Sequence, residues 1–398
     1  MAPQHTARPE KKTWIATNAP VAIVRCDDYD RSTVLSAVRK ACDAASMPSV
    51  DGLTVLVKPN VLSDAKVELN ITTNPEIVRA LIRILRERGA KTVLVGDSPG
   101  IQGPSFVPKN CGLQEVCEEE RAEWCDFTKE PDVRTVPGSF GKRLPFAHAL
   151  QEADMVFSVA KFKTHQLMYA TGTVKNLFGL VPGLHKSPCH LAYPSRESFA
   201  RLVAGIYSIA KPSFNILDGV IAMEGAGPAN GTPRHLGLIL AGCDGTAVDA
   251  AQSTIMGYDP LTIPLTQALL DRKLTGWRTP QEISYPMLDA NDLVVEDYKR
   301  IEQQPSSHLF TSLVLPLFTR VLKLRHQKKQ PEPLFDMSRC IRCGRCVRIC
   351  PGKALSLVGD GNDRRISIDY GRCIRCYCCH EVCPADAIRI NSTERTEA

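Results

Sequence analysis

The chain has 398 residues, of which 43% are hydrophobic and 23% are charged, and its formal net charge at pH 7 is +6. This length accommodates a large domain and a small one. The modest positive charge is spread along the chain, which argues against the strongly basic class of nucleic-acid-binding proteins, and we expect no nucleic-acid partner.

Residues 1–14 are polar and include Lys11 and Lys12, but they contain no apolar stretch of the kind found in signal peptides. We therefore expect a loose N-terminal tail and no export signal. The sequence contains no run of about 18 apolar residues and predicts no transmembrane segment. The expected location is cytoplasmic.

Residues 15–300 are expected to form one α/β domain. Apolar runs typical of buried strands occupy residues 21–25, 53–57, 92–96, 155–160, 215–217 and 236–241. Helices are expected at residues 32–45, from Pro75 to Gly89, and near residues 246–257 and 261–274. Since an apolar strand, a helix and another apolar strand follow one another between residues 53 and 96, the sheet is predicted to be mainly parallel and covered on both faces.

Polar side chains follow five of these strands. They are Lys58 and Asn60, Asp97 and Ser98, Lys161, Lys163 and His165, Asp218, and Asp244. Ligands of open parallel sheets bind outside the carboxyl ends of the strands, so the set predicts a binding site at that edge. A single member could instead cap a helix, as Asp244 could do before Thr246.

Several short motifs occur in this region. In chain order they are Lys58-Pro59-Asn60, Gly96-Asp97-Ser98-Pro99-Gly100, Lys161-x-Lys163-Thr164-His165, Val174-Lys175-Asn176-Leu177-Phe178-Gly179, Asp218-Gly219, Met223-Glu224-Gly225-x-Gly227-Pro228 and Val248-Asp249-Ala250. With these motifs, residues 50–275 resemble the domain-of-unknown-function 362 family. Members often carry a fused ferredoxin. The resemblance implies an architecture and a set of motif residues, but no established reaction.

The lysines of these motifs predict a site for a small anion, because clustered ammonium groups need a counter-charge. They are Lys58, Lys161, Lys163 and Lys175. The other residues expected at the same site are Asn60, Asp97, Ser98, Asn176, Asp218 and Glu224. Two alternatives stay open: the carboxylates neutralise the lysines internally, or they hold a divalent cation that bridges to a phosphate or carboxylate.

His165 is the candidate proton donor or acceptor, and Lys163 is the second candidate catalytic residue. Together with His185 and His190, His165 could instead be a metal ligand. The three histidines lack the i, i+4 spacing of helical metal sites, which weakens that alternative.

Two cysteine runs lie near the C-terminal end of the sequence. They read Cys340-x2-Cys343-x2-Cys346-x3-Cys350-Pro351 and, thirty-three positions later, Cys373-x2-Cys376-x2-Cys379-x3-Cys383-Pro384. With this spacing, the fourth cysteine of each run binds the cluster of the other run. One [4Fe-4S] cluster is therefore expected on Cys340, Cys343, Cys346 and Cys383, and a second on Cys373, Cys376, Cys379 and Cys350. Residues 335–392 resemble a bacterial-type two-cluster ferredoxin, which implies a small α+β domain over residues 335–398.

Disulfide bonds and structural zinc fit these cysteines less well than iron–sulfur clusters do. Disulfides need an oxidising compartment, and structural zinc sites use pairs of thiolates rather than runs of four. Cys378 is a ninth cysteine in this part and is left without a cluster, so we expect it to be a bystander. The remaining seven form no C-x2-C pair and are expected to be reduced core thiols.

Residues 301–334 are expected to connect the two domains. Their apolar stretch, residues 309–324, is broken by Pro316 and either packs between the domains or lies on a membrane surface.

These features predict an iron–sulfur redox protein whose clusters move electrons to or from a small anionic substrate in the α/β domain. The alternative is an electron carrier or assembly factor whose α/β domain only docks a partner protein. The first cysteine run is surrounded by Arg339, Arg342, Arg345 and Arg348. We therefore expect a redox partner with an acidic docking face.

Overall fold

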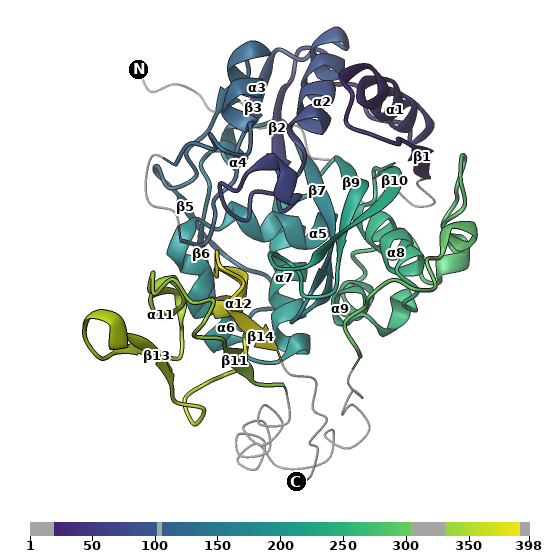
Figure 1. The fold of residues 1–398 in the computed structure, drawn as a ribbon. Helices are drawn as coiled ribbons and strands as arrows, with labels where there is room; N and C mark the ends of the chain where they lie inside the picture. The colour runs from purple at the N-terminus through teal and green to yellow at the C-terminus, as the bar shows by residue number, and fades with distance from the viewer. Residues whose placement is uncertain (1–19, 102–105, 304–330, 391–398) are drawn as a thin grey trace.

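The computed structural model describes residues 20–101, 106–303 and 331–390 (Figure 1). The expected tail over residues 1–14 and the apolar stretch over residues 309–324 lie outside these described residues. Among the described residues, no helix is both long enough and apolar enough to cross a membrane.

The larger part of the chain is built on one eight-stranded sheet. Its strands are β1 (Val21–Arg25), β2 (Thr54–Pro59), β3 (Thr92–Val95), β4 (Glu123–Trp124), β7 (Met155–His165), β8 (Tyr169–Thr171), β9 (Phe214–Glu224) and β10 (Thr232–Gly242). They lie in the order β1-β10-β9-β7-β2-β3-β4, with β8 beside β7. Strands β5 (Asp132–Thr135) and β6 (Arg143–Phe146) form a separate hairpin.

Strands β9, β7, β2, β3 and β4 are parallel, as the apolar runs predict. The β10, β1 and β8 pairings are antiparallel. Residues 225–231 connect β9 to β10 and are too few for a crossover helix, so these two strands pair as a hairpin.

Helices cover both faces of the sheet (Figure 1). On one face are α1 (Arg31–Ala44), α2 (Pro75–Glu87) and α3 (Leu113–Glu119); on the other are α4 (Ala149–Glu152), α5 (Thr173–Asn176), α6 (Ser187–Ala192), α7 (Arg196–Ala210), α8 (Gly245–Ile255) and α9 (Pro264–Asp271). Val55 and Val57 of β2 face the first group, and Leu56 between them faces the second. Both faces of this strand are therefore buried, which explains why its sequence is apolar without alternation.

Strands β7 and β9 are longer than the sequence indicates. The apolar runs end at residues 160 and 217, whereas the strands continue to His165 and Glu224. Lys161, Lys163 and Asp218 therefore lie within strands and not after them. The strands can continue because Lys161 and Asp218 are register partners, and their opposite charges pair across the sheet.

Residues 331–390 form a smaller unit, yellow-green to yellow in Figure 1. Strand β11 (Pro333–Phe335) pairs with β14 (Ile388–Ile390), and β12 (Leu355–Val358) pairs with β13 (Arg365–Ile368), both antiparallel. Each cysteine run forms a loop that leads into a one-turn helix, either α11 (Arg345–Ile349) or α12 (Cys378–Glu381). Each helix is followed by a strand, β12 or β14.

The smaller unit lies against the larger one through both of its helices (Figure 1). Ser187 Oγ of α6 donates a hydrogen bond to the Ile349 carbonyl of α11 at 2.7 Å. Asn230 Nδ2, in the loop before β10, donates to the His380 carbonyl of α12 at 3.1 Å. The cysteine-bearing loops are thereby placed next to the α/β sheet.

Candidate functional site

The two cysteine loops share one backbone conformation. Arg342 and Arg375, thirty-three residues apart, have φ angles of 58° and 51°, and Gly344 and Tyr377 have φ angles of 70° and 62°. Residues other than glycine rarely adopt this left-handed backbone conformation. Its recurrence at equivalent positions therefore indicates that the loop requires it. Turns of this kind aim backbone N–H groups at a common point and form concavities that hold anions, iron–sulfur centres among them.

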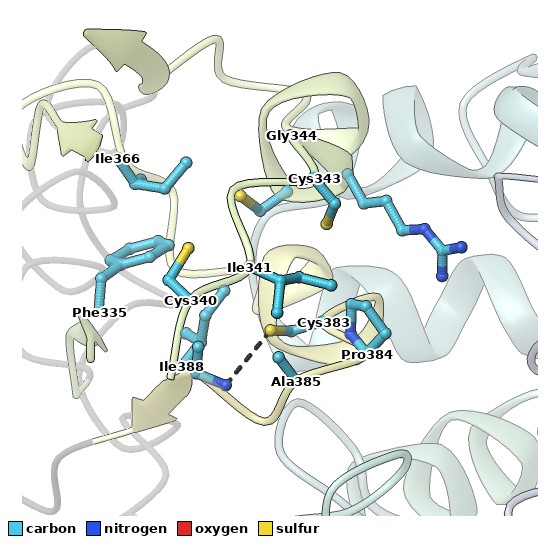
Figure 2. A pocket seen from close by; sticks show the side chains of 13 residues that line it. Phe335, Cys340, Ile341, Cys343, Gly344, Ile366, Cys383, Pro384, Ala385 and Ile388 are labelled. Atoms are coloured by element: carbon cyan, nitrogen blue, oxygen red, sulfur yellow. Dashed lines mark hydrogen bonds between the residues drawn. The ribbon is translucent and has the colours of Figure 1, made fainter. Parts of the chain in front are cut away.

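Four cysteines surround one cavity in the smaller unit. Cys340, Cys343 and Cys346 come from the first loop, and Cys383 comes from the end of the second (Figure 2). The space between them is otherwise lined mostly by apolar residues, Phe335 and Ile388 among them. The structure therefore brings together the four cysteines that the spacing assigns to the first cluster.

The other four cysteines lie close to one another as well. Burial raises the pKa of the Cys379 thiol well above its usual value, and charges on the nearby Cys376, Cys373 and Cys350 raise it further. Placing several thiolates so close together is unfavourable unless a positively charged group binds them. A cluster supplies such a group, so the donor set fits.

The last cysteine of each run accepts a backbone hydrogen bond. The Ala354 N–H donates to Cys350 Sγ and the Ala387 N–H donates to Cys383 Sγ, both at 3.3 Å (Figure 2 shows the second). These bonds favour the thiolate form that metal binding requires. Among the described residues, no three His, Cys, Asp or Glu side chains converge as a site for a single metal ion.

Two of the four candidate lysines are neutralised inside the α/β domain. Lys58 Nζ lies 2.9 Å from Asp97 Oδ1, and Lys161 Nζ lies 2.9 Å from Asp218 Oδ2. Both lysine side chains are fully buried, which lowers their pKa values, although the paired carboxylates oppose that effect. These are the internal counter-charges that the sequence left as an alternative to a ligand.

Asn176 and Gly179 hold the Lys58 pair in place. Asn176 Oδ1 accepts a hydrogen bond from Lys58 Nζ at 3.0 Å, and its Nδ2 donates to the Lys58 carbonyl at 2.9 Å. A Cβ atom at Gly179 would lie 2.1 Å from Asp97 Oδ1 and 2.6 Å from Lys58 Cε. The motif from Val174 to Gly179 therefore packs directly onto the buried ion pair.

Lys163 has a different environment. Its ammonium group donates to Asn60 Oδ1 and to the Ile71 carbonyl, both at 2.8 Å, and it makes no ion pair with the described residues. Burial, followed by repulsion from Lys175 and Lys161, lowers its pKa to about 7. Glu224, by contrast, lies near Lys299 and Arg234, away from the other candidates.

His165 contacts the smaller unit. Its Nδ1 accepts hydrogen bonds from the Leu167 and Met168 N–H groups, so the proton of the neutral ring lies on Nε2. Nε2 is 3.1 Å from Glu381 Oε1 of α12. Burial and the nearby Lys175 lower the pKa of His165 to about 4, so the ring is neutral at pH 7.

Glu381 is ionised at neutral pH. Burial alone would raise its pKa, but His165, Lys175 and His190 together outweigh burial and lower the pKa to about 2. The smaller unit thus inserts one carboxylate among basic groups of the α/β domain.

A larger cavity of about 540 Å³ lies between the two units and is partly open to solvent. Of the candidate residues, it is lined by Asn60, Asp97, Ser98, Lys175 and Asn176. Lys58, Lys161, Lys163, His165, Asp218 and Glu224 are not among its lining residues. We call it the interdomain cavity.

The helices of the smaller unit close the other side of the interdomain cavity. They contribute Arg345, Arg348, Cys378, Glu381 and Cys383. His190 and Lys186 of the α/β domain also line it. Sequence reasoning did not assign Lys186 or Glu381 to a site, because neither lies at a strand end and only the docking of the two units brings them together.

Two of these additional groups are buried polar side chains. Burial lowers the pKa of His190 to about 4, and its Nδ1 has no hydrogen-bond partner among the described residues. Its ring is stacked on Phe199, with centroids 4.4 Å apart. Lys186 donates to the Ser98 carbonyl, and burial lowers its pKa to about 7.

Comparison with known proteins gives two family matches. Residues 55–254 match a domain of unknown function, DUF362, and residues 339–387 match a 4Fe-4S dicluster domain. The chain is also 31% identical over 283 residues to the thylakoid-associated protein sll1697 of Synechocystis sp., covering 70% of this chain and 87% of that protein.

Solved structures show only distant similarity. A Thermotoga maritima protein superposes with a TM-score of 0.33 and 13% identity, and the lactate racemase apoprotein of Thermoanaerobacterium thermosaccharolyticum with 0.38 and 10%. The matches cover 50% and 57% of this chain, and about half of each of those chains, 52% and 54%.

Proposed function

Because the chain belongs to the DUF362 family and carries a 4Fe-4S dicluster domain, we propose that it is an iron–sulfur oxidoreductase that exchanges electrons with a small anionic substrate in the interdomain cavity. The dicluster domain supports the electron-transfer role. When bound, [4Fe-4S] clusters supply or accept single electrons. A substrate would therefore need a binding site close to the cysteines.

The position of Cys383 carries the proposal. This cysteine and the following Pro384 line both the cavity among the cysteines and the interdomain cavity. A molecule in the interdomain cavity could therefore contact Cys383, which is one of the four cysteines expected to hold the first cluster. Cys378, next to Cys379 of the second set, lines the same cavity.

The charges of the interdomain cavity favour an anion. Its lining includes the cations Lys175, Lys186, Arg345 and Arg348 and the carboxylates Asp64, Asp97 and Glu381. Asp97 is already paired with Lys58, which leaves Asp64 and Glu381 as the other carboxylates of the lining. The cationic side chains of the lining therefore outnumber these two carboxylates.

Residues around the cavity would bind and orient the substrate. Asp249 accepts hydrogen bonds from the Thr173 and Val174 N–H groups at the start of α5, which fixes the direction of Lys175. His165 contacts Glu381, which lines the interdomain cavity, and carries a proton on Nε2. It remains our candidate for donating a proton to, or accepting one from, a group at Glu381. Lys163 does not line the cavity, but its ammonium group donates a hydrogen bond to Asn60, which does.

A redox partner would meet the opposite side of the cysteine cavity. Cys343 is exposed there, and Ile341 beside it is 63% exposed. Arg342, next to Cys343, is exposed as well. An exposed arginine beside an exposed apolar side chain fits a partner with an acidic docking face.

The test follows cluster absorbance under anaerobic conditions. Chemically reduced protein is mixed with small carboxylates and phosphate esters one at a time, and reoxidation is timed. We expect some anions to reoxidise the protein, with Lys175→Met slowing the reaction by about 10-fold or more through lost electrostatic stabilisation. Lys91→Met is the matched control, since Lys91 is exposed and does not line the interdomain cavity.

A different result would favour the alternative role. If no anion changes the rate while an acidic carrier protein exchanges electrons readily, the chain is an electron carrier and its α/β domain serves docking.

A further inference from the structure

The interdomain cavity is lined by cations from both units. Lys175 lies on α5 of the α/β domain. Arg345 and Arg348 lie on α11 of the smaller unit, three residues apart and thus on the same side of that helix. The cationic groups therefore come from two separate parts of the fold and not from one cluster.

None of these three cationic side chains makes a hydrogen bond or ion pair with the side chains or backbone that the structure describes. Other cations of the molecule do have partners: Lys58 and Lys161 pair with aspartates, and Arg375 pairs with Glu332. Burial lowers the pKa of Lys175, and Glu381 only partly opposes this. An anionic group bound beside Lys175 would favour its charged form and so offset the effect of burial.

Apolar side chains also line the cavity. They include Leu62, Leu69 and Ile71 from the segment between β2 and α2, together with Ile101 and Phe178. Leu69 is 54% exposed in a chain whose other large apolar residues are mostly buried. The cavity volume of about 540 Å³ lies within the range of roughly 300–1,000 Å³ that is usual for small-molecule sites. The cavity therefore has room for a ligand longer than a single carboxylate or phosphate.

We propose that the interdomain cavity binds a dianion with an apolar body. One anionic group lies against Lys175, the other lies against Arg345 and Arg348, and the apolar body lies against Leu62, Leu69 and Phe178. This inference rests on the proposed function, because it specifies the class of substrate that would lie next to Cys383. It also makes the smaller unit part of the binding site, so that each unit alone has half of it.

The experiment uses the full chain with its clusters loaded, under anaerobic conditions. Calorimetric titration compares unbranched α,ω-dicarboxylates from glutarate to sebacate with the monocarboxylates of equal carbon number. We expect the best dicarboxylate to bind at least ~10-fold more tightly than its monocarboxylate, equivalent to about 1.4 kcal/mol. We also expect an optimum chain length, because one length matches the separation of Lys175 from the two arginines.

Variants then assign the two ends. Lys175→Met and Arg348→Met should each lower the dicarboxylate affinity by ~10-fold and leave the dicarboxylate no better than the monocarboxylate. Lys91→Met and Arg372→Met, which change exposed cations outside the cavity, should leave both affinities unchanged. Iron content and the visible spectrum confirm that every variant holds its clusters.

Three outcomes would overturn the proposed dianion site. They are equal binding of mono- and dicarboxylates to the unmodified protein, no loss of affinity in Arg348→Met, and no binding of any member of the series below about 10 mM. The proposed function fails separately, because saturated dicarboxylates test binding alone: tight dicarboxylate binding, together with no anion that reoxidises the reduced protein in the absorbance assay, would count against the oxidoreductase and keep the dianion site. Electron exchange with a monoanion, unaffected by Arg348→Met, would keep the oxidoreductase and exclude the dianion site.

Discussion

At the scale of single residues, Cys383 has the most consequential position in the molecule. It belongs by sequence to the second cysteine run, yet it lies with the first three cysteines of the other run and also lines the interdomain cavity. Cys350 occupies the equivalent place in the first run, as its matching hydrogen bond from Ala354 shows. The crossing of these two cysteines can be tested with pairs of substitutions.

We expect Cys383→Ser combined with Cys343→Ser to lose only one cluster, because both cysteines lie on the same cavity. Iron should fall from about eight to about four per chain. Cys350→Ser combined with Cys343→Ser should instead lose both clusters and nearly all iron. Iron and sulfide analysis of anaerobically purified protein distinguishes the pairs. A crossover would be excluded if the first pair lost both clusters and the second lost one.

His165 makes the stability of the α/β domain dependent on pH. Its pKa falls from 6.5 to about 4 in the folded chain, so between these values the unfolded chain binds a proton that the folded chain does not. Stability is therefore full above about pH 6.5 and decreases as the pH falls toward 4, by up to about 3 kcal/mol. Burial of His190, whose pKa is also about 4, adds to the same trend.

Replacing His165 should weaken this dependence. In His165→Asn the amide oxygen can still accept the backbone hydrogen bonds of Leu167 and Met168, but the side chain does not titrate. The measurement is the denaturant midpoint between about pH 7.5 and 5.5, followed by tryptophan fluorescence while cluster absorbance is monitored. Equal slopes for the two proteins would show that His165 titrates normally in the folded chain.

At the scale of elements, the long strands β7 and β9 decide which lysines belong to a site. Lys161 and Asp218 are paired across these strands inside the sheet, and Lys58 is paired with Asp97 at the end of β2. Lys175, on the short helix α5, is the one member of the four candidate lysines that lines the interdomain cavity. Lysines of similar motifs therefore have different roles.

We predict that Lys161→Met destabilises the protein by about 3–5 kcal/mol, because it leaves the Asp218 carboxylate buried without its partner. Lys175→Met should change the unfolding free energy by less than about 1 kcal/mol, since it removes no ion pair. Urea denaturation with constant m-values measures both. Comparable stability losses in the two variants would place Lys175 in the structural core rather than at a binding site.

At the scale of the whole molecule, the docking of the smaller unit completes the interdomain cavity. The contact includes the Ser187–Ile349 and Asn230–His380 hydrogen bonds and the approach of His165 to Glu381. All three join the helices of the smaller unit to the α/β domain.

The double variant Ser187→Ala with Asn230→Ala should loosen this contact, since each lost hydrogen bond contributes about 1 kcal/mol. We expect calorimetric unfolding to split from one transition into two, with cluster spectra unchanged. Ser208→Ala is the matched control, because Ser208 donates only to Gly205 within its own helix. A single transition in the double variant would mean that the two units are held together by other contacts.

The cysteine spacing and the apolar runs were sufficient to predict much of this protein. They predicted the parallel α/β sheet and the dicluster domain, because each depends on side chains that are close in sequence or on which faces of a strand are buried. The start of α2 at Pro75 was predictable for the same reason, since Asn74 caps it locally.

Which charged residues line the interdomain cavity was decided only by the tertiary structure. The sequence places Lys58, Lys161, Lys163 and Lys175 in motifs, but the partners of the first three are residues far away in the chain. The interdomain cavity itself is formed by segments of both units, and Glu381 and Arg348 enter it through docking alone. Charge pairing inside a protein depends on distance in space, and residue types and their spacing do not determine that distance across separate domains.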